Sequence, residues 1–372
     1  QFFGLLNIFS GGAFDKLSIM MLGVAPYITA SIIFQLLTMI FPKLKEMYYE
    51  SGEQGRQKFN QYSRLLTVPL AVMQSYALLV LLQRQGIIEN LGWFNLAANI
   101  SVVVAGTVFL MWIGELISEK GIGNGVSIII FAGIVSGLPQ NIKQTLVSYD
   151  PSQIPTYLVF LALALVVIVG VVFITEGQRN IPINYAKRVR GFKMYGGVST
   201  YLPLRVSMAG VIPIIFAISI MLFPQMASNF LTLVPWKSVA DAAKSAADFF
   251  QTPWFYDSLY FILVVLFTYF YTAVTFDPKE IAENLQKQGG YVPGIRPGIH
   301  TAEFLYRVLN RITLVGAVFL GLIAVLPYLV KSATGIVTLS LGGTSLLIVV
   351  SVVIDIIKQA NAQITMREYE GF

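Results

Sequence analysis

The 372-residue sequence contains no cysteine, one histidine and few charged residues. Without cysteine the chain can form neither a disulfide nor a thiolate metal site. The single histidine, His300, follows a stretch rich in glycine and proline, where we expect a solvated loop residue rather than a metal ligand. Charged residues make up 12% of the chain and hydrophobic residues 56%, whereas soluble domains carry about 25% charged residues. This composition indicates a membrane protein.

Long stretches without charge are abundant. Crossing the hydrocarbon core of a bilayer takes about 20 mostly apolar residues. Nine stretches that lack Asp, Glu, Lys and Arg are predicted to be transmembrane helices: 17–42, 65–83, 90–114, 121–142, 151–175, 206–236, 258–276, 312–330 and 332–354. The first residue is Gln1 rather than Met. Because nine spans leave the ends on opposite sides, we expect a fragment whose native chain has a tenth span upstream.

The middles of these stretches contain no ionisable residue, Ser–His pair, phosphate loop or metal-ligand spacing. Enzymes and proton-coupled pumps in membranes need such groups. Glu115 and Asp355 lie near the ends of spans, where we expect them to cap a helix or to pair with a basic neighbour. We therefore predict no catalytic role, no cofactor and no metal.

The positive charges divide unequally between the two sides of the predicted membrane. When the nine spans alternate, the side that holds the loop 41–64 carries 19 Lys and Arg residues and the other side carries six. The positive-inside rule therefore places the loop 41–64 in the cytoplasm.

Two cytoplasmic loops, 176–205 and 277–311, are much longer than ordinary connections. Both contain aromatic and β-branched residues together with turn glycines, which predicts ordered hairpins. Their basic residues have two interpretations. They can be a docking surface for a large cytosolic partner, or they can serve orientation and contact anionic lipid headgroups.

Short motifs recur in the two halves of the chain. GVAPYI at 23–28 returns as GVIPII at 210–215, and GIGNGVSIII at 121–130 resembles LGGTSLLIVV at 341–350. Interrupted spans in corresponding places suggest inverted repeats with a functional site between them. We expect Pro26 and Pro213 to bend their helices, either as packing kinks or in helices that separate along an interface.

Branched aliphatic residues follow helical spacing in two of these spans. Val24, Ile28 and Ile32 recur every four residues, as do Val126 and Ile130. Such a stripe can be packing or lipid contact, or a hydrophobic constriction that excludes water. Before the first span, GLLNIFSGGAFDK at 4–16 is too apolar for a surface loop and too short to cross a bilayer.

Several longer stretches together resemble one family. They are NIFSGGAF, GVAPYITASIIFQLLT, SGEQGRQKFNQYSR, MWIGELISEKGIGNGVSIIIFAGIVSGLP, EGQRNIPINYAKR, STYLPLRVSMAGVIPIIFA, KQGGYVPGIRPG and GGTSLLIVVSVVID, and they occur in family order from end to end. On these stretches the chain resembles the SecY family, the channel subunits of the bacterial protein translocon.

The resemblance implies an all-α polytopic membrane protein. The fold expected is two inverted halves of five helices, with nine of the ten helices in this chain and the family's first helix upstream. The implied divisions are a plug and outer turn at 1–16, the rest of the N-terminal half at 17–142, and the C-terminal half at 143–372. The small SecE subunit would clamp the two halves, and SecG would often be present as a further subunit.

The resemblance also assigns candidate functional residues by position. The plug, a short half-helix in the outer funnel, would comprise Gly4, Leu5, Leu6, Asn7, Ile8, Phe9, Ser10, Gly11 and Gly12. The pore ring would comprise Val24, Ile28, Val126, Ile130, Ile215 and Ile348. The lateral gate would include Pro26, Ile32 and Pro213. Docking of cytosolic partners would use Lys187, Arg188, Arg190, Lys193 and Arg296.

The function that the resemblance implies is a passive protein-conducting channel in the bacterial plasma membrane. It would pass secretory polypeptides across and release transmembrane segments sideways into lipid, driven by the SecA motor or the translating ribosome. Its partners would be signal sequences, nascent chains and membrane lipids, with no small-molecule substrate.

Two other interpretations assign the sequence to a different functional class. A secondary transporter can use the same inverted repeats, but it needs a mid-membrane polar cluster that this sequence lacks. A membrane-bound enzyme would need a reactive group within the spans.

Overall fold

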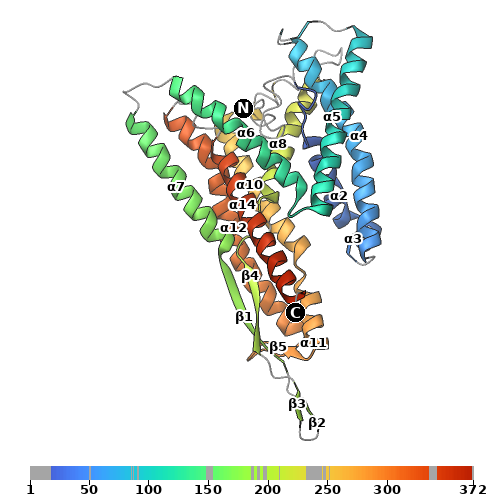
Figure 1. Ribbon diagram of the computed structural model, residues 1–372, viewed down its shortest axis with the longest axis vertical. Coiled ribbons are helices and arrows are strands. Elements are labelled where there is room, and N and C mark those ends of the chain that lie inside the picture. The colour runs from blue at the N-terminus through green and yellow to red at the C-terminus, as the bar shows by residue number, and fades with distance from the viewer. Residues whose placement is uncertain are drawn as a thin grey trace.

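In the computed structural model the chain is mostly helical, and the helices run side by side (Figure 1). The residues described are 18–49, 52–84, 86, 88–89, 92–147, 154–185, 188–190, 193–195, 199–208, 210–231, 245, 249–250, 252–334 and 342–370.

Of the first five described helices, four make up one side of the bundle, and the fifth spans the two sides. They are α2 (Ala25–Ile40), α3 (Pro42–Tyr49), α4 (Gly52–Arg84), α5 (Trp93–Lys120) and α6 (Gly125–Val147). α6 packs on both α5 and, on the other side, α14 (Gly342–Glu370). α2 and α3 meet at a bend of 113°. α4 packs against α2, α3 and α5, so these four helices form one group at the right of Figure 1.

The later helices form the other side of the bundle. They are α7 (Ile154–Glu176), α8 (Ile212–Leu231), α10 (Pro253–Thr275), α11 (Pro278–Lys287), α12 (Ile299–Thr334) and α14 (Gly342–Glu370). α10 packs along α12 and α8, and α14 packs on α6, α7 and α12. α8 also contacts α2 and α4, so it connects the two sides.

The predicted spans correspond to apolar helices among the described residues. Five helices are long and apolar enough to cross a membrane, and the bent pair α2–α3 can supply a sixth span. Three shorter apolar helices cover Gly125–Pro139, Leu161–Glu176 and Ile212–Met221. Each of the nine predicted stretches overlaps one of these helices, and the all-α polytopic membrane fold is confirmed.

The ends of the helices differ from the ends of the charge-free stretches. α4 begins at Gly52 rather than near residue 65, and α14 continues to Glu370 rather than ending near 354. Loss of apolar character marks where a segment leaves the hydrocarbon layer. Backbone hydrogen bonding continues beyond that point because charged side chains on a helix are solvated there.

The two long loops have different structures. In 176–205, β1 (Gln178–Tyr185) and β4 (Ser199–Arg205) pair antiparallel from Gln178↔Arg205 to Asn184↔Ser199. Beyond them β2 (Arg188–Arg190) pairs with β3 (Lys193–Tyr195), so an ordered hairpin is confirmed here. The sheet and the hairpin project from the helices (Figure 1).

The prediction of a hairpin in 277–311 is wrong. This segment forms α11, then β5 (Gly290–Tyr291), which adds to the edge of β1, and it enters α12 at Ile299. Asp277 explains the start of α11, because its side chain accepts hydrogen bonds from the amides of Lys279 and Glu280. His300 is therefore in the first turn of α12 rather than in a loop, although it is exposed.

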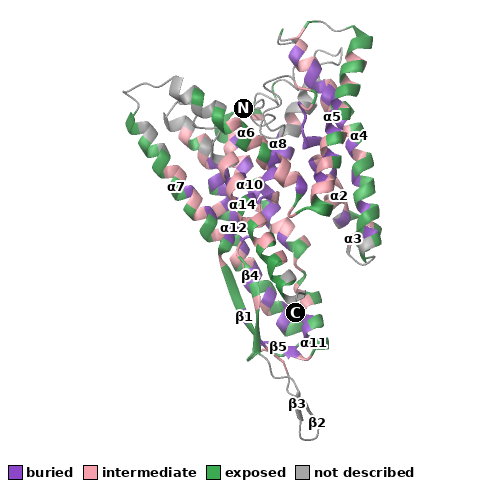
Figure 2. Ribbon diagram, in the orientation of Figure 1, coloured by how far each residue is buried: buried purple, intermediate pink, exposed green. Residues whose placement is uncertain are grey.

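The core lies where the two sides of the bundle meet. One apolar cluster joins buried residues of the central helices, whereas the outer faces of α4 and α7 are exposed (Figure 2). The exposed residues of α7 are apolar, among them Val166 and Phe173. A helix of a soluble protein would be polar on that face, so the pattern is that of a helix facing lipid.

Candidate functional site

The six residues of the predicted pore ring all belong to the main apolar cluster or pack against it. Val24 immediately precedes α2, which carries Ile28; Val126 and Ile130 lie on α6, Ile215 on α8 and Ile348 on α14. Five of the six are at most 6% exposed, and Val126 is half-buried and packs against the same apolar cluster. Four helices far apart in the sequence thus place branched aliphatic side chains in one cluster.

The position of Val126 depends on a close contact between two glycines. Gly125 lies directly on the backbone carbonyl of Gly114 in α5, so a side-chain carbon at Gly125 has no room. The Ser118 hydroxyl accepts a hydrogen bond from the Gly125 amide at 2.8 Å and donates to the Gly114 carbonyl at 3.0 Å. This contact fixes the start of α6 against α5, and Val126 follows directly.

The repeated motif builds the same backbone twice. Gly23 has φ +55° and Gly210 has φ +57°, a left-handed conformation that favours glycine. α2 begins two residues after Gly23, and α8 begins two residues after Gly210. The amides of Ile28 and Ile215 bond to the carbonyls of Val24 and Val211 at 3.1 and 3.3 Å. The motif is therefore a helix start in both halves.

This geometry corrects the prediction for the two prolines. Pro26 and Pro213 are each the second residue of their helix, not a point of bending within one. A proline in the first turn removes no helical hydrogen bond, because the amide there has no carbonyl partner within the helix. The break in each span comes from the preceding glycine.

α2 and α8 lie against each other, and α4 also contacts α8. We call this contact the α2–α8 interface. The three residues predicted for the lateral gate, Pro26, Ile32 and Pro213, are all buried, with Ile32 only 3% exposed.

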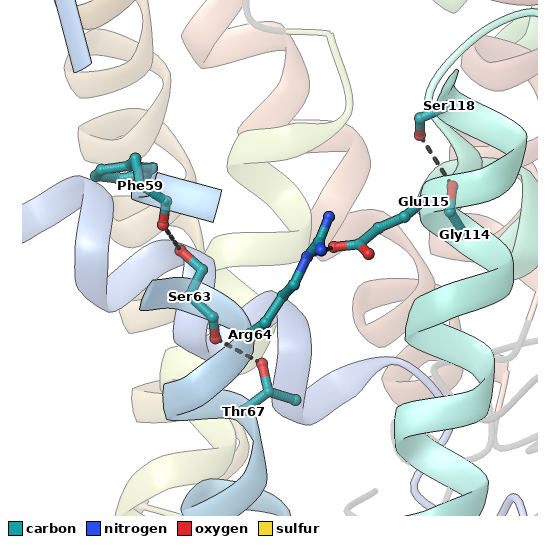
Figure 3. Close-up of polar contacts among 7 residues, drawn as sticks. All are labelled: Phe59, Ser63, Arg64, Thr67, Gly114, Glu115 and Ser118. Atoms are coloured by element: carbon teal, nitrogen blue, oxygen red, sulfur yellow. Dashed lines mark hydrogen bonds and ion pairs between the residues drawn. The ribbon is translucent and has the colours of Figure 1, made fainter. Parts of the chain in front are cut away.

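An ion pair joins α4 and α5 (Figure 3). Arg64 Nε lies 2.5 Å from Glu115 Oε1, and the Glu115 side chain is 19% exposed. The expected pairing of Glu115 with a basic neighbour is thus confirmed. Tyr27, in the first turn of α2, lies within electrostatic reach of both charges. The neighbouring hydroxyls of Ser63 and Thr67 bond to backbone carbonyls of their own helix.

Of the predicted docking residues, Arg296 is described in full. It is exposed between Gly294 and Gly298, whose φ values are +80° and +93°, and its carbonyl accepts a hydrogen bond from Thr301 at 2.9 Å. Arg188, Arg190 and Lys193 lie in the β2–β3 hairpin, where Arg190 is opposite Lys193. Lys187 lies outside the described residues, as does the whole predicted plug, 4–12.

Some residues that shape the site were not singled out by sequence reasoning. The repeated motif pointed to its prolines, whereas its glycines produce the geometry. Arg64 is the partner of Glu115, and no local spacing marks a pair separated by 51 residues. In the part of the chain that is described, no group of His, Asp and Glu side chains could hold a metal ion.

Comparison with known proteins decides the family. The sequence model of the SecY family matches residues 18–357. The chain belongs to the SecY family. The protein translocase subunit SecY of Thermotoga maritima is 45% identical over 98% of this chain and 83% of its own length. That of Mycobacterium tuberculosis H37Rv is 43% identical, over 100% and 87% respectively.

Solved channel structures share the fold with this SecY-family chain. One reported as the structure of a protein conducting channel has a TM-score of 0.66 at 20% identity and covers 95% of this chain and 83% of its own. A structure from a study of the plug domain of the SecY protein has a TM-score of 0.62 at 20% identity. It covers 91% of this chain and 81% of its own. The structure of the idle yeast Ssh1 complex bound to the yeast 80S ribosome has a TM-score of 0.59 at 14% identity. It covers 93% of this chain and 80% of its own.

Proposed function

We propose that this chain is the central subunit of a protein-conducting channel of the bacterial plasma membrane, which passes secretory polypeptides across and releases transmembrane segments into lipid. The observation that carries this proposal is the apolar cluster in which α2, α6, α8 and α14 place the six ring residues. Membership of the SecY family supports it independently.

The chemistry of the ring suits a seal that opens for polypeptide. Branched aliphatic side chains offer no hydrogen bond to water or to small ions, so the constriction excludes both while it is closed. The same side chains contact an extended chain of any sequence without a specific polar partner. Transport therefore needs no catalytic group in the ring, and a partner supplies the energy.

The α2–α8 interface is proposed as the lateral gate, with Pro26, Ile32 and Pro213 on its two sides. Each helix starts two residues after a glycine in the left-handed conformation, and the residues that meet across the interface are largely apolar. An apolar segment of a nascent chain gains free energy when its surface moves from water into lipid. Such a segment would leave through this interface.

Residues 4–12 are proposed as the plug that covers the ring from outside. This segment is apolar and ends in Ser10-Gly11-Gly12, which allows the chain to turn at low steric cost.

Basic residues of the two long loops are proposed as the docking surface for cytosolic partners, namely SecA and the ribosome. The planar guanidinium of Arg296 suits a carboxylate or phosphate partner. Lys187, Arg188, Arg190 and Lys193 supply a second basic group on the β2–β3 hairpin and beside it. The small subunits SecE and SecG are proposed as membrane partners.

Crosslinking to a stalled precursor tests the channel directly, because the chain has no cysteine of its own. One cysteine replaces Ile130 or Ile215 in the full-length protein, and another is placed in a secretory precursor stalled during transport. We expect a mixed disulfide with the stalled precursor and none with a precursor that is not targeted. No disulfide from either position, while transport proceeds, would show that polypeptide does not pass the ring.

A further inference from the structure

The bundle and the β1–β4 sheet meet at a cluster of four charges. We call this cluster the α14 junction and define it by Glu176, Arg205, Asp355 and Lys358. Glu176 is the last residue of α7, Arg205 is the last of β4, and the other two lie on α14. The junction holds two acids and two bases, so its formal charge is balanced.

Lys358 joins α14 to the end of α7. Its Nζ lies 3.0 Å from Glu176 Oε1 and donates a hydrogen bond to the Thr175 carbonyl at 3.2 Å. Carbonyls in the last turn of a helix have no partner within the helix, so the lysine satisfies one of them. Gly177, which follows α7, accepts a hydrogen bond through its carbonyl from the Val206 amide at 2.8 Å. This bond closes the base of the β1–β4 sheet.

Asp355 lies three residues before Lys358, on the same face of α14. Its carboxylate lies beside Gly210, two residues before α8, with Oδ2 3.7 Å from the point that a side-chain carbon of Gly210 would occupy. The amides of a first helical turn lack partners, and a negative charge there is favourable. Lys358, Arg205 and Glu176 are all within electrostatic reach of Asp355.

These contacts form a continuous path from the hairpin to α8. Glu176 and Arg205 flank the β1–β4 sheet, since Glu176 ends α7 two residues before β1 and Arg205 ends β4. Lys358 contacts Glu176, and Asp355 interacts electrostatically with both residues and lies beside Gly210. Moving the base of the hairpin therefore changes the electrostatic environment of Asp355, and with it the support of the first turn of α8.

We propose that Asp355 is a positioning residue that holds the first turn of α8 in its closed arrangement, and that Lys358 couples it to the base of the hairpin. This inference rests on the proposed function, in which α8 is one side of the lateral gate. A partner that docks on the hairpin would displace Glu176 and Arg205 and so weaken the hold of Asp355 on α8.

The test measures the gate and transport in the same samples. Spin labels on cysteines at the exposed Leu65 of α4 and Leu266 of α10 report separation across the α2–α8 interface, in the complete complex in phospholipid vesicles. Asp355→Asn and Lys358→Gln are compared with wild type, with and without a stalled precursor. We expect both variants to shift the resting distances toward those of the precursor-bound state, and to raise transport of a precursor with a defective signal sequence about fivefold.

Controls separate positioning from general damage. Glu368→Gln removes an exposed carboxylate from the same helix and should change neither distances nor transport. Lys358→Arg keeps the charge and should behave as wild type. The double variant should exceed neither single variant, because both act through one contact path.

The outcomes distinguish this inference from the proposed function. If the wild-type distances widen with the stalled precursor but those of folded Asp355→Asn and Lys358→Gln match resting wild type, the positioning role is wrong and the gate stands. If wild-type distances do not respond to the precursor, the gate assignment fails and the inference fails with it. The melting temperature of each variant shows that it is folded.

Discussion

α2 and α8 begin with the same six-residue pattern, nearly the same glycine φ and equivalent hydrogen bonds, yet their surroundings differ. Near the start of α2 the charged pair is Arg64–Glu115, which joins two long helices of the bundle. Near the start of α8 the charged groups belong to the α14 junction, which includes Glu176 and Arg205 on either side of the β1–β4 sheet. The repeat therefore fixes the local backbone but not the neighbours.

This difference separates two mechanical roles. Among the described residues, the charges near the first turn of α2 belong to helices α4 and α5 and not to the β1–β4 sheet. The first turn of α8 has a direct path to the hairpin through Asp355 and Lys358. If a docked partner opens the interface between them, α8 is the helix on which the signal arrives.

The largest expected effect comes from placing a charge at equivalent ring positions. Ile28→Asp and Ile215→Asp bury a carboxylate in the middle of a span, which costs about 2.5–3.5 kcal/mol. Both variants should melt at lower temperature and conduct ions at rest, as thermal unfolding in detergent and planar-bilayer conductance would show. The matched controls are Ile28→Leu and Ile215→Leu, which keep the volume. If the Ile28→Asp channel neither conducts ions at rest nor melts at a lower temperature, α2 does not contribute to the proposed ring.

The next effect tests the two glycines themselves. Gly23→Ala and Gly210→Ala each force a side chain into the left-handed region, at a cost of about 1–2 kcal/mol. We expect the larger loss at Gly23, which is buried, because Gly210 is only partly buried and, among the described residues, Asp355 is the neighbour within 4 Å of a carbon added there. Chemical denaturation measures both losses.

Gly137→Ala is the control for these substitutions. Gly137 lies within α6 with open space around it, so alanine there should stabilise by up to about 1 kcal/mol. Equal stability of all three alanine variants would show that the left-handed geometry is not required.

A smaller effect is expected at the α4–α5 ion pair. Arg64→Ala leaves Glu115 mostly buried without a partner and should cost about 1–2 kcal/mol, whereas Glu115→Ala should cost less because Arg64 is 46% exposed. A double-mutant cycle should give a coupling of about 1 kcal/mol. The exposed pair His300–Glu303 supplies a control with coupling near zero. A coupling free energy near zero between Arg64 and Glu115 would show that this ion pair contributes no more to stability than an exposed surface pair does.

The smallest effect on stability, with a large one on transport, is expected at Arg296. Because this side chain is exposed, Arg296→Glu should change the free energy of unfolding by less than about 0.5 kcal/mol. Reversing the charge at the proposed docking surface should slow transport about tenfold. Arg311→Glu, on the exposed side of α12, is the control. Normal export by the Arg296 variant would rule out its docking role.

Sequence reasoning located the apolar helices because their signal is local. A segment that lies in hydrocarbon must be apolar along its whole length, so each span is readable without knowledge of its neighbours. The ends of α4 and α14 were missed because charged side chains do not end a helix in water. The segment 277–311 does not form the predicted hairpin, because turn glycines mark breaks in structure but do not determine whether a strand or a helix lies between them.

Taken alone, the sequence determined the membrane class, the repeated helix starts and the residue types of the proposed ring. These follow from composition and spacing, which act within one helix. Only the tertiary structure decided which helices meet: it brought ring residues from four helices into one cluster, paired Arg64 with Glu115, and placed Asp355 beside Gly210. Such contacts depend on how distant helices pack, and packing leaves no periodic signal in the sequence of either partner.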